Sequence, residues 1–460
     1  MVVDLVIRGG RIVTPYGIVE AGIGVDEGKV VAIAKEPRLP NADQVIDVGG
    51  HFVLPGVIDA HTHFREPGKT AREDFQTGTQ AAAAGGVTTI FEMPIAIPCV
   101  SSADILEDRK NLVTKRAVVD FGLYGGAGMQ NVDEIRGLAT AGAIGYKTFL
   151  HAPPAGREIE FEGAYATDDG VLFRILQTVA STGLPSSIHA ENNAIIGFLT
   201  EQLKSLGRTD AMAHFDSRPN FVEAVTIAKV IILAEAAKTR LHIAHLSTKE
   251  GLRLIAHAKA NGQSVTVETC PHYLTLTNEA MKELGPYAKI NPPLRSQADV
   301  DALWRGLNNG TIDMVVSDHA PWTKDEKELG WHEIWKAQSG APTIETMLPL
   351  LLQKVNEGQL SLETLVRVTS SRTAQVFGVY PRKGVISVGS DADFVVVDLN
   401  KTMTVEKGKM YTKARAFTPY DGWNVKGWPV MTIVRGRVVM EDGEVIGKPG
   451  YGEFVAPTRG

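Results

Sequence analysis

The sequence is poor in cysteine, and this excludes a disulfide-stabilised secreted domain. Cys99 and Cys270 are the only cysteines in 460 residues. Two cysteines cannot form a disulfide framework in so long a chain, so they favour a reducing compartment. The first residues also lack a basic segment followed by a long apolar one, so no signal peptide is expected. We therefore expect a cytoplasmic protein.

Long apolar runs and an excess of positive charge are also missing. No apolar run is long enough to span a bilayer, so no membrane partner is expected. The 47 lysines and arginines are outnumbered by 53 aspartates and glutamates, which gives a net charge of −6. Because no basic stripe with interleaved aromatic residues is found, no nucleic-acid partner is expected either.

The two ends of the chain share one pattern. Short apolar strands bounded by glycine turns occur in residues 1–51 and again in residues 381–460. We therefore expect both termini to build one small β-sandwich domain, with the ends of the chain close together in space.

The middle of the chain, residues 52–380, alternates apolar strands with helical segments. The candidate strands are 52–59, 87–93, 117–124, 143–150, 184–189, 241–246, 264–269 and 312–318. The candidate helices are 71–84, 103–113, 131–140, 170–182, 220–237, 249–261 and 297–308. Eight such alternations predict an α/β fold of the (β/α)₈ TIM-barrel type. A doubly wound open sheet is the alternative, but its glycine-rich phosphate turn is not found after the first strand.

A pair of histidines stands at the end of the first candidate strand. His61 and His63 follow the apolar run 52–58. Alternate residues of a strand project to the same side, so the two imidazoles would point at one place. Two polar residues with ordinary hydrogen bonds would give the same pattern. For one His-X-His motif, that explanation is as good as a metal site.

Four more reactive side chains stand at or near the ends of other candidate strands. They are Lys147, His189, His245 and Asp318. Taken singly, a lysine can extend to solvent, a histidine can be a satisfied core residue, and an aspartate can cap a turn. In a TIM barrel, however, the carboxyl ends of the strands meet at the active-site face. Separate structural roles do not explain why all six residues occur there, so the pattern predicts a metal centre.

The motifs around these residues resemble those of the cyclic amidohydrolases. This group of the amidohydrolase superfamily holds hydantoinases, dihydropyrimidinases, allantoinases and dihydroorotases. The similar segments are Asp59-Ala60-His61-Thr62-His63, Gly145-Tyr146-Lys147, His189-Ala190-Glu191-Asn192, His245-Leu246-Ser247 and Ser317-Asp318-His319-Ala320-Pro321. The resemblance continues to Asp393 and so covers nearly the whole chain.

The resemblance implies two divalent metal ions. One would be bound by His61, His63 and Asp318, and the other by His189 and His245. A set of histidines and carboxylates suits zinc, and manganese, cobalt and nickel are compatible with it.

The resemblance also implies a mechanism. Lys147 would carry a carbamate formed from CO₂, whose two oxygens bridge the ions. A water shared by the ions would become a hydroxide that attacks a ring carbonyl. Asp318 would take its proton and pass it to the departing ring nitrogen. We therefore expect an enzyme that hydrolyses a cyclic amide bond.

Residues near the centre bear on the choice of cyclic amide. The segment 63–68 resembles that of dihydroorotases, in which the arginine, here Arg65, binds a substrate carboxylate, and Asn291 stands in a similar motif. Ile95 and Trp322, however, stand where dihydroorotases have an asparagine and a histidine. A buried carboxylate would be short of polar partners in such a pocket. Dihydroorotase is therefore the lowest-ranked alternative.

The segment after the fourth candidate strand favours a hydantoinase. D-selective hydantoinases and dihydropyrimidinases have a tyrosine five residues after the lysine, where this chain has Ala152. The segments 330–337 and 345–349 look more like L-hydantoinases. We expect Phe64, Phe149 and the loop 151–157, which includes Ala152, as walls of the side-chain pocket, and Arg65 and Asn291 as further substrate-binding residues. The prediction is a hydantoinase for 5-monosubstituted hydantoins, with allantoinase and then dihydropyrimidinase as alternatives.

Two other interpretations stay open. A non-catalytic relative could keep the fold for assembly, although such proteins typically lose metal ligands. The same site could also run a different reaction, such as exocyclic deamination or ester hydrolysis, because a fold alone does not define a chemistry. Relatives are commonly homotetramers, so the resemblance also implies a homo-oligomer.

Overall fold

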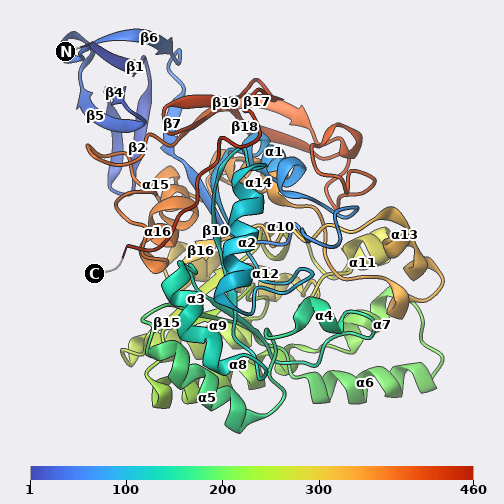
Figure 1. Ribbon diagram of the computed structural model, residues 1–460. Coiled ribbons are helices and arrows are strands. Elements are labelled where there is room, and N and C mark those ends of the chain that lie inside the picture. Colours follow the sequence, from blue (N-terminus) through green and yellow to red (C-terminus); the bar gives the residue numbers. More distant parts are fainter. Residues whose placement is uncertain (1, 459–460) are drawn as a thin grey trace.

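The computed structural model describes residues 2–458 and shows an α/β protein (Figure 1). Strands from both ends of the chain form two sheets at the top of Figure 1. They are β1 (Val2–Arg8), β2 (Arg11–Thr14), β3 (Gly17–Glu20), β4 (Gly22–Asp26), β5 (Lys29–Ala34), β6 (Asn41–Asp47), β7 (Phe52–Pro55), β17 (Phe394–Thr404), β18 (Asn424–Val434), β19 (Arg437–Glu441) and β20 (Glu444–Val445). One sheet has the order β5-β4-β1-β6 and the other the order β20-β19-β18-β17-β7-β2-β3.

The remaining strands are parallel and form what we call the parallel core. They are β8 (Val57–Thr62), β9 (Val87–Glu92), β10 (Asp120–Leu123), β11 (Gly125–Gly126), β12 (Tyr146–Phe149), β13 (Ser186–His189), β14 (Leu241–Ile243), β15 (Val265–Thr269) and β16 (Met314–Val315). They pair in chain order, β8 to β10 in one sheet and β11 to β16 in another. A bridge between Thr62 and His319 brings the carboxyl ends of the first and last strands together.

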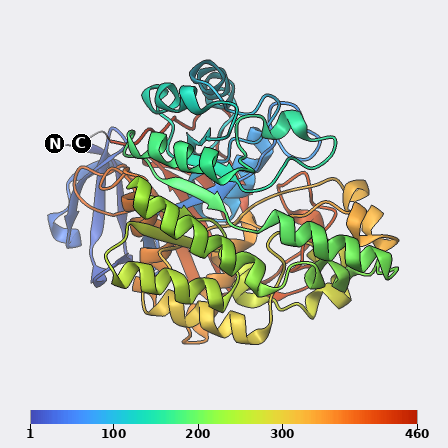
Figure 2. The same ribbon diagram turned by 90° about the horizontal axis from the view of Figure 1, so that it is seen from below.

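Helices follow the parallel strands along the chain and pack against them, as Figure 2 shows from below. The predicted helices correspond to α1 (Phe75–Ala84), α2 (Ala103–Thr114), α3 (Ile135–Ala141), α5 (Asp169–Ala180), α8 (Asn220–Ala237), α9 (Lys249–Ala260) and α12 (Gln297–Asn308). Further helices are α4 (Glu158–Phe161), α6 (Asn193–Ser205), α7 (Ala211–Asp216), α10 (Pro271–Thr275), α11 (Ala280–Leu284), α13 (Lys324–Glu328), α14 (Ile344–Asn356), α15 (Leu362–Val366) and α16 (Arg372–Val376). Within residues 2–458, no helix combines the length and the apolar character needed to cross a membrane.

Side-chain caps explain where several of these helices begin. Asp74, Ser102, Asp168 and Thr248 each accept a hydrogen bond from the backbone N–H three residues further on. Such a bond satisfies one of the free N–H groups in the first turn of a helix. The cap residues therefore set the boundary between each strand–helix loop and its helix.

The first candidate strand differs from its prediction. Residues 52–59 were expected as one strand of the barrel, but the chain forms two strands that join different sheets. β7 pairs with β17 and β2, whereas β8 pairs with β9. Gly56 separates them, and a Cβ atom there would lie 2.1 Å from Thr88 Oγ1 and 2.9 Å from Asp393 Cβ. Close packing at this glycine therefore lets the chain pass from one sheet to the other.

The expectation that the two ends of the chain meet concerns residues outside 2–458, which the structure does not describe. Both termini supply strands to one seven-stranded sheet, because β17 pairs with β7. The segment after β20, however, leaves that sheet and runs along the parallel core, where Phe454 bridges Phe121. Figure 1 accordingly shows this dark red segment running down the left side of the molecule, away from β1.

A buried ion network ties the C-terminal segment to the parallel core. Lys383 is 1% exposed, and its Nζ lies 2.7 Å from Asp120, 3.0 Å from Asp391 and 2.6 Å from Asp393. Arg435 forms a further ion pair with Asp120. Three clustered carboxylates could suggest a cation site, but the Lys383 ammonium already lies among them. This cluster is therefore a structural ion network.

We predict that Lys383→Met destabilises the protein by about 3–5 kcal/mol, because it leaves buried carboxylates without their central cation. The midpoint of urea unfolding measures the effect. Lys29→Met is the matched control: Lys29 also pairs with Asp391, but its side chain is 47% exposed. That variant should lose about 0–1 kcal/mol. Equal losses in the two variants would contradict this account of the network.

Candidate metal centre

Three predicted ligands converge where the first and last parallel strands meet. His61 and Thr62 end β8, His63 follows them, and Asp318 lies three residues after β16. Asp318 Oδ1 lies 3.5 Å from His61 Nε2 and 3.4 Å from His63 Nε2. All three side chains are buried, and their nearest ligand atoms lie within 4.8 Å of one another. This spacing leaves room for a cation among them.

Two further histidines lie beside this group. His189 ends β13 and His245 follows β14 by two residues. His189 Nδ1 lies 3.0 Å from His245 Nε2, and the ring centroids of His245 and His61 are 5.3 Å apart. The four predicted histidines therefore form one continuous cluster at the carboxyl ends of the strands.

Lys147 completes the cluster from β12. Its side chain is fully buried, and its Nζ has no hydrogen-bond partner among the described residues. Burial lowers the pKa of Lys147 to about 8, while Glu268 and Asp318 act in the opposite direction. Burial and then the charge of Lys147 lower the pKa of His61 to about 4. The imidazole is therefore neutral near pH 7 and keeps a lone pair for a cation.

The backbone is strained at two of the predicted ligands. His245 and Asp318 have φ angles of 36° and 45°, a region that residues other than glycine rarely adopt. Buried carboxylates hold the chain at both places. Glu268 accepts the His245 N–H at 3.2 Å, and Asp59 accepts the N–H of Ser317 at 3.0 Å. Strain of this kind persists where the surroundings fix it, and it is common at functional sites.

The donor atoms fit divalent metal ions. His61 Nε2, His245 Nδ1 and Lys147 Nζ are buried without a hydrogen-bond partner in the described part of the chain, and His63 Nδ1 is as well. Buried polar atoms normally have partners, so such a cluster needs an explanation. Burial also raises the pKa of Asp318 to about 8, against the effect of Lys147. A cation beside Asp318 would favour its charged form and occupy the free imidazole nitrogens.

Two carboxylates that support these histidines were not predicted. Glu268 in β15 accepts a hydrogen bond from His61 Nδ1, and Glu191 lies 3.0 Å from His189 Nε2. In each histidine, the bond leaves the other ring nitrogen facing the cluster. Glu191 stands two residues after His189 in the motif His189-Ala190-Glu191-Asn192. The sequence signal for Glu268 is a charged residue within the apolar strand pattern Val-Thr-Val-Glu-Thr.

A cavity of about 550 Å³ opens onto the cluster. Arg65, Phe149 and Asn291, which were predicted to bind substrate, line it together with Ile95. Arg65 is 4% exposed, and its Nε and Nη1 have no hydrogen-bond partner among the described residues. The Oδ1 atom of Asn291 also has no hydrogen-bond partner among the described residues. The cavity therefore offers both N–H donors and an oxygen acceptor beside the candidate metal centre.

Two predicted substrate-binding residues lie elsewhere. Phe64 is fully buried, and its ring packs 5.6 Å from Phe75 and 5.7 Å from His319. Ala152 is not among the residues that line the cavity, although its neighbour His151 is. Phe64 was expected as a wall of the pocket, but its ring lies in the hydrophobic core.

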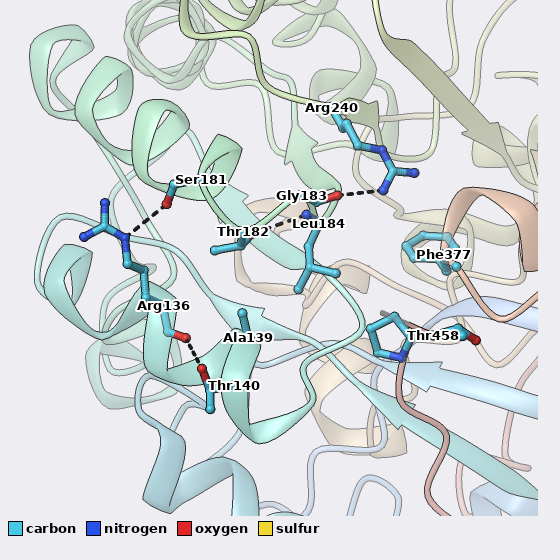
Figure 3. Close-up of a pocket in the computed structure, with 12 residues that line it drawn as sticks. Arg136, Ala139, Thr140, Ser181, Thr182, Gly183, Leu184, Arg240, Phe377 and Thr458 are labelled. Atoms are coloured by element: carbon cyan, nitrogen blue, oxygen red, sulfur yellow. Dashed lines mark hydrogen bonds between the residues drawn. The ribbon is translucent and has the colours of Figure 1, made fainter. Parts of the chain in front are cut away.

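The structure has another cavity, of about 500 Å³, at the opposite ends of the strands (Figure 3). Figure 3 shows Arg136 directed at Ser181 and Arg240 directed at Gly183, with hydrogen bonds of 3.1 and 2.8 Å. The part of the chain that the structure describes contributes no histidine, cysteine, aspartate or glutamate to its lining. This cavity therefore lacks the groups needed for acid–base or metal chemistry.

Comparison with known proteins agrees with the geometry. The amidohydrolase family matches residues 52–439. The L-hydantoinase of Paenarthrobacter aurescens is 41% identical over 454 residues, which cover 98% of each chain. The allantoinase of Rubrobacter xylanophilus is 38% identical over 458 residues, or 99% of this chain and 98% of that one. The solved L-hydantoinase (dihydropyrimidinase) from Arthrobacter aurescens has a TM-score of 0.95 and 40% identity, and covers 99% of this chain and 100% of its own.

The chain therefore belongs to the amidohydrolase family. This confirms the resemblance to the cyclic amidohydrolases that its motifs indicated. The match spans the whole parallel core and most of the C-terminal strands, so it includes every residue of the candidate metal centre.

We predict that the purified protein, supplied with Zn²⁺ and bicarbonate, takes up two ions per chain in equilibrium dialysis. His61→Ala and His189→Ala should each lower the uptake, because each removes one nitrogen donor. His257→Ala, an exposed histidine of α9, is the control and should bind as the wild type does. Unchanged uptake in His61→Ala would contradict the assignment of the site.

Proposed function

We propose that this enzyme opens the ring of 5-monosubstituted hydantoins to give N-carbamoyl amino acids. The observation that carries the proposal is the buried cluster of four histidines, a lysine and an aspartate, of which His63, His189, His245 and Asp318 line one cavity. The relatedness to an L-hydantoinase over the whole chain supports it.

Two divalent ions, with zinc the first choice and manganese, cobalt or nickel compatible, fit the donor set. His61, His63 and Asp318 would hold one ion, and His189 and His245 the other. Lys147, as a carbamate formed with CO₂, would supply an anionic oxygen donor to the ions in place of a buried amine. When bound, such ions lower the pKa of a water and polarise the amide carbonyl.

Asp318 is placed to move the proton. Its carboxylate lines the cavity and lies against His61 and His63. It would accept the proton of the attacking water and then donate it to the ring nitrogen as the amide bond breaks. The hydrogen bond from the Ser317 N–H to Asp59 would help to keep the Asp318 carboxylate directed into the cavity.

The cavity suits a hydantoin with an apolar substituent. Ile95, Phe149, Phe161, Leu329 and Trp335 give it apolar walls. A ring substituent would contact these walls, while the ring carbonyls would face the donors of the site. Dihydroorotase remains the lowest-ranked alternative, because Ile95 offers no polar atom for a substrate carboxylate.

Allantoin hydrolysis is the second candidate, and one observation favours it. Allantoin is a hydantoin with a ureido substituent, which has both N–H donors and a carbonyl acceptor. The free N–H groups of Arg65 and the free Oδ1 of Asn291 match those groups in kind. The same cavity could therefore accept a hydantoin with either an apolar or a ureido substituent. A direct assay decides between the two substrates.

We further propose the finer architecture and assembly. The parallel core would close as an eight-stranded barrel, which the bridge between Thr62 and His319 supports. The four-stranded and seven-stranded sheets would form a sandwich domain from residues 1–51 and 381–460, beside a catalytic domain at 52–380. A homotetramer in the cytoplasm is the expected state.

A substrate panel tests the proposed function. The enzyme loaded with zinc and bicarbonate is assayed with both enantiomers of 5-benzylhydantoin, allantoin, dihydrouracil and dihydroorotate, and the products are identified by mass spectrometry. We expect the highest kcat/KM for a 5-benzylhydantoin, because its ring fills the apolar part of the cavity. A higher kcat/KM for allantoin would favour allantoinase over hydantoinase as the function. Release of ammonia without ring opening would contradict both.

We predict that Asp318→Asn lowers kcat by at least 10²-fold, because an amide cannot carry the proton between water and ring nitrogen. Metal content, measured by atomic emission, should remain substantial, since the histidines and Lys147 are unchanged. Asp133→Asn, with an exposed carboxylate, is the control and should keep full activity. Near-normal turnover in Asp318→Asn would remove this residue from the proton-transfer role.

A further inference from the structure

A single buried carboxylate contacts histidines of both halves of the candidate metal centre. Glu268 is fully buried in β15 and accepts three N–H groups. Its Oε1 receives the ring Nδ1–H of His61 and the backbone N–H of His245, and its Oε2 receives Nε2–H of His242 at 3.0 Å. Neither Cys270 nor any of the six predicted metal ligands accepts three such hydrogen bonds.

The bond to His61 decides which ring nitrogen faces the centre. A carboxylate can only accept, so Nδ1 of His61 carries the proton and Nε2 keeps its lone pair. Nε2 is the atom that lies 3.5 Å from Asp318 Oδ1 and has no hydrogen-bond partner among the described residues. A carboxylate behind a metal-bound histidine fixes its tautomer and orientation and raises its basicity.

The bond to His245 acts on the backbone. His245 has a φ of 36°, and this strained conformation directs its ring toward His189. Glu268 accepts the N–H of this residue at 3.2 Å. Relaxation of the backbone would cost this bond, so the carboxylate helps to hold the second histidine pair in place.

His242 fixes Glu268 in turn. The ring of His242 lies between Glu268 and Thr266, with Nδ1 2.9 Å from Thr266 Oγ1. Its side chain is fully buried and outside the substrate cavity. The carboxylate is therefore held from behind and cannot rotate away from His61 without breaking the bond to His242.

Glu191 can be compared with Glu268, because it also supports a predicted histidine ligand. It supports the ring of His189 alone, and its charge also faces Arg218 at 3.6 Å. We propose that Glu268 is a positioning residue for both metal ions, through the His61 ring and the His245 backbone, whereas Glu191 positions a ligand of only one. The inference rests on the metal centre of the proposed function.

Metal binding of three proteins tests the proposal: wild type, Glu268→Gln and Glu191→Gln. Each is titrated with Co²⁺ against a chromophoric chelator, and the cobalt absorption bands are recorded. Glutamine is isosteric but uncharged. Glu268→Gln should therefore weaken the binding of both cobalt ions by about 10–100-fold and alter the absorption bands of both. Glu191→Gln should weaken the binding of one ion to a similar degree and leave the affinity for the other within about twofold of the wild-type value.

A folding control separates positioning from general damage. The urea midpoints of the metal-free proteins should be similar for the two variants, and Glu268→Asp, which keeps the charge, should recover part of the cobalt affinity. Unchanged affinities in Glu268→Gln, or loss of a single ion there, would overturn the proposal. If the wild type binds two ions but hydrolyses no cyclic amide, the proposed function fails while this inference stands. A wild type that binds no divalent ion overturns both.

Discussion

The structure depends on the cost of burying four imidazoles, an amine and a carboxylate at one place. Each loses its hydration, and several donor atoms have no hydrogen-bond partner among the described residues. Such an arrangement is unfavourable in a folded protein unless something else satisfies the atoms. Divalent cations meet this requirement, since they take the free lone pairs and balance the carboxylate. Cation binding would thus supply the chemistry of the site and also stabilise its geometry.

Rigid surroundings keep these groups together. The predicted ligands come from β8, β12 and β13 and from the segments after β14 and β16, so their positions follow from the pairing of parallel strands. Buried carboxylates then fix the details: Asp59 holds the backbone before Asp318, and Glu268 holds His61 and His245. The geometry of the candidate metal centre therefore rests on buried residues that do not line the cavity.

Sequence patterns revealed more of the centre than of the pocket. Alternation within strands placed His61 and His63 on one side, and the strand–helix rhythm put His189 and His245 at neighbouring strand ends. Phe64 and Ala152 do not line the cavity, and the sequence could not show this, because a loop's path depends on contacts that have no sequence period. The split at Gly56 was missed for a related reason, since an apolar run does not show which sheet each half joins.

Anomalous diffraction from crystals grown with Zn²⁺ and bicarbonate tests the central claim most directly. The account predicts two zinc peaks within the cluster, one beside His61 and His63 and the other beside His189 and His245, with density for a carbamate on Lys147 between them. An unmodified Lys147 amine with no zinc peak near these histidines, in crystals that contain the metal, would contradict it.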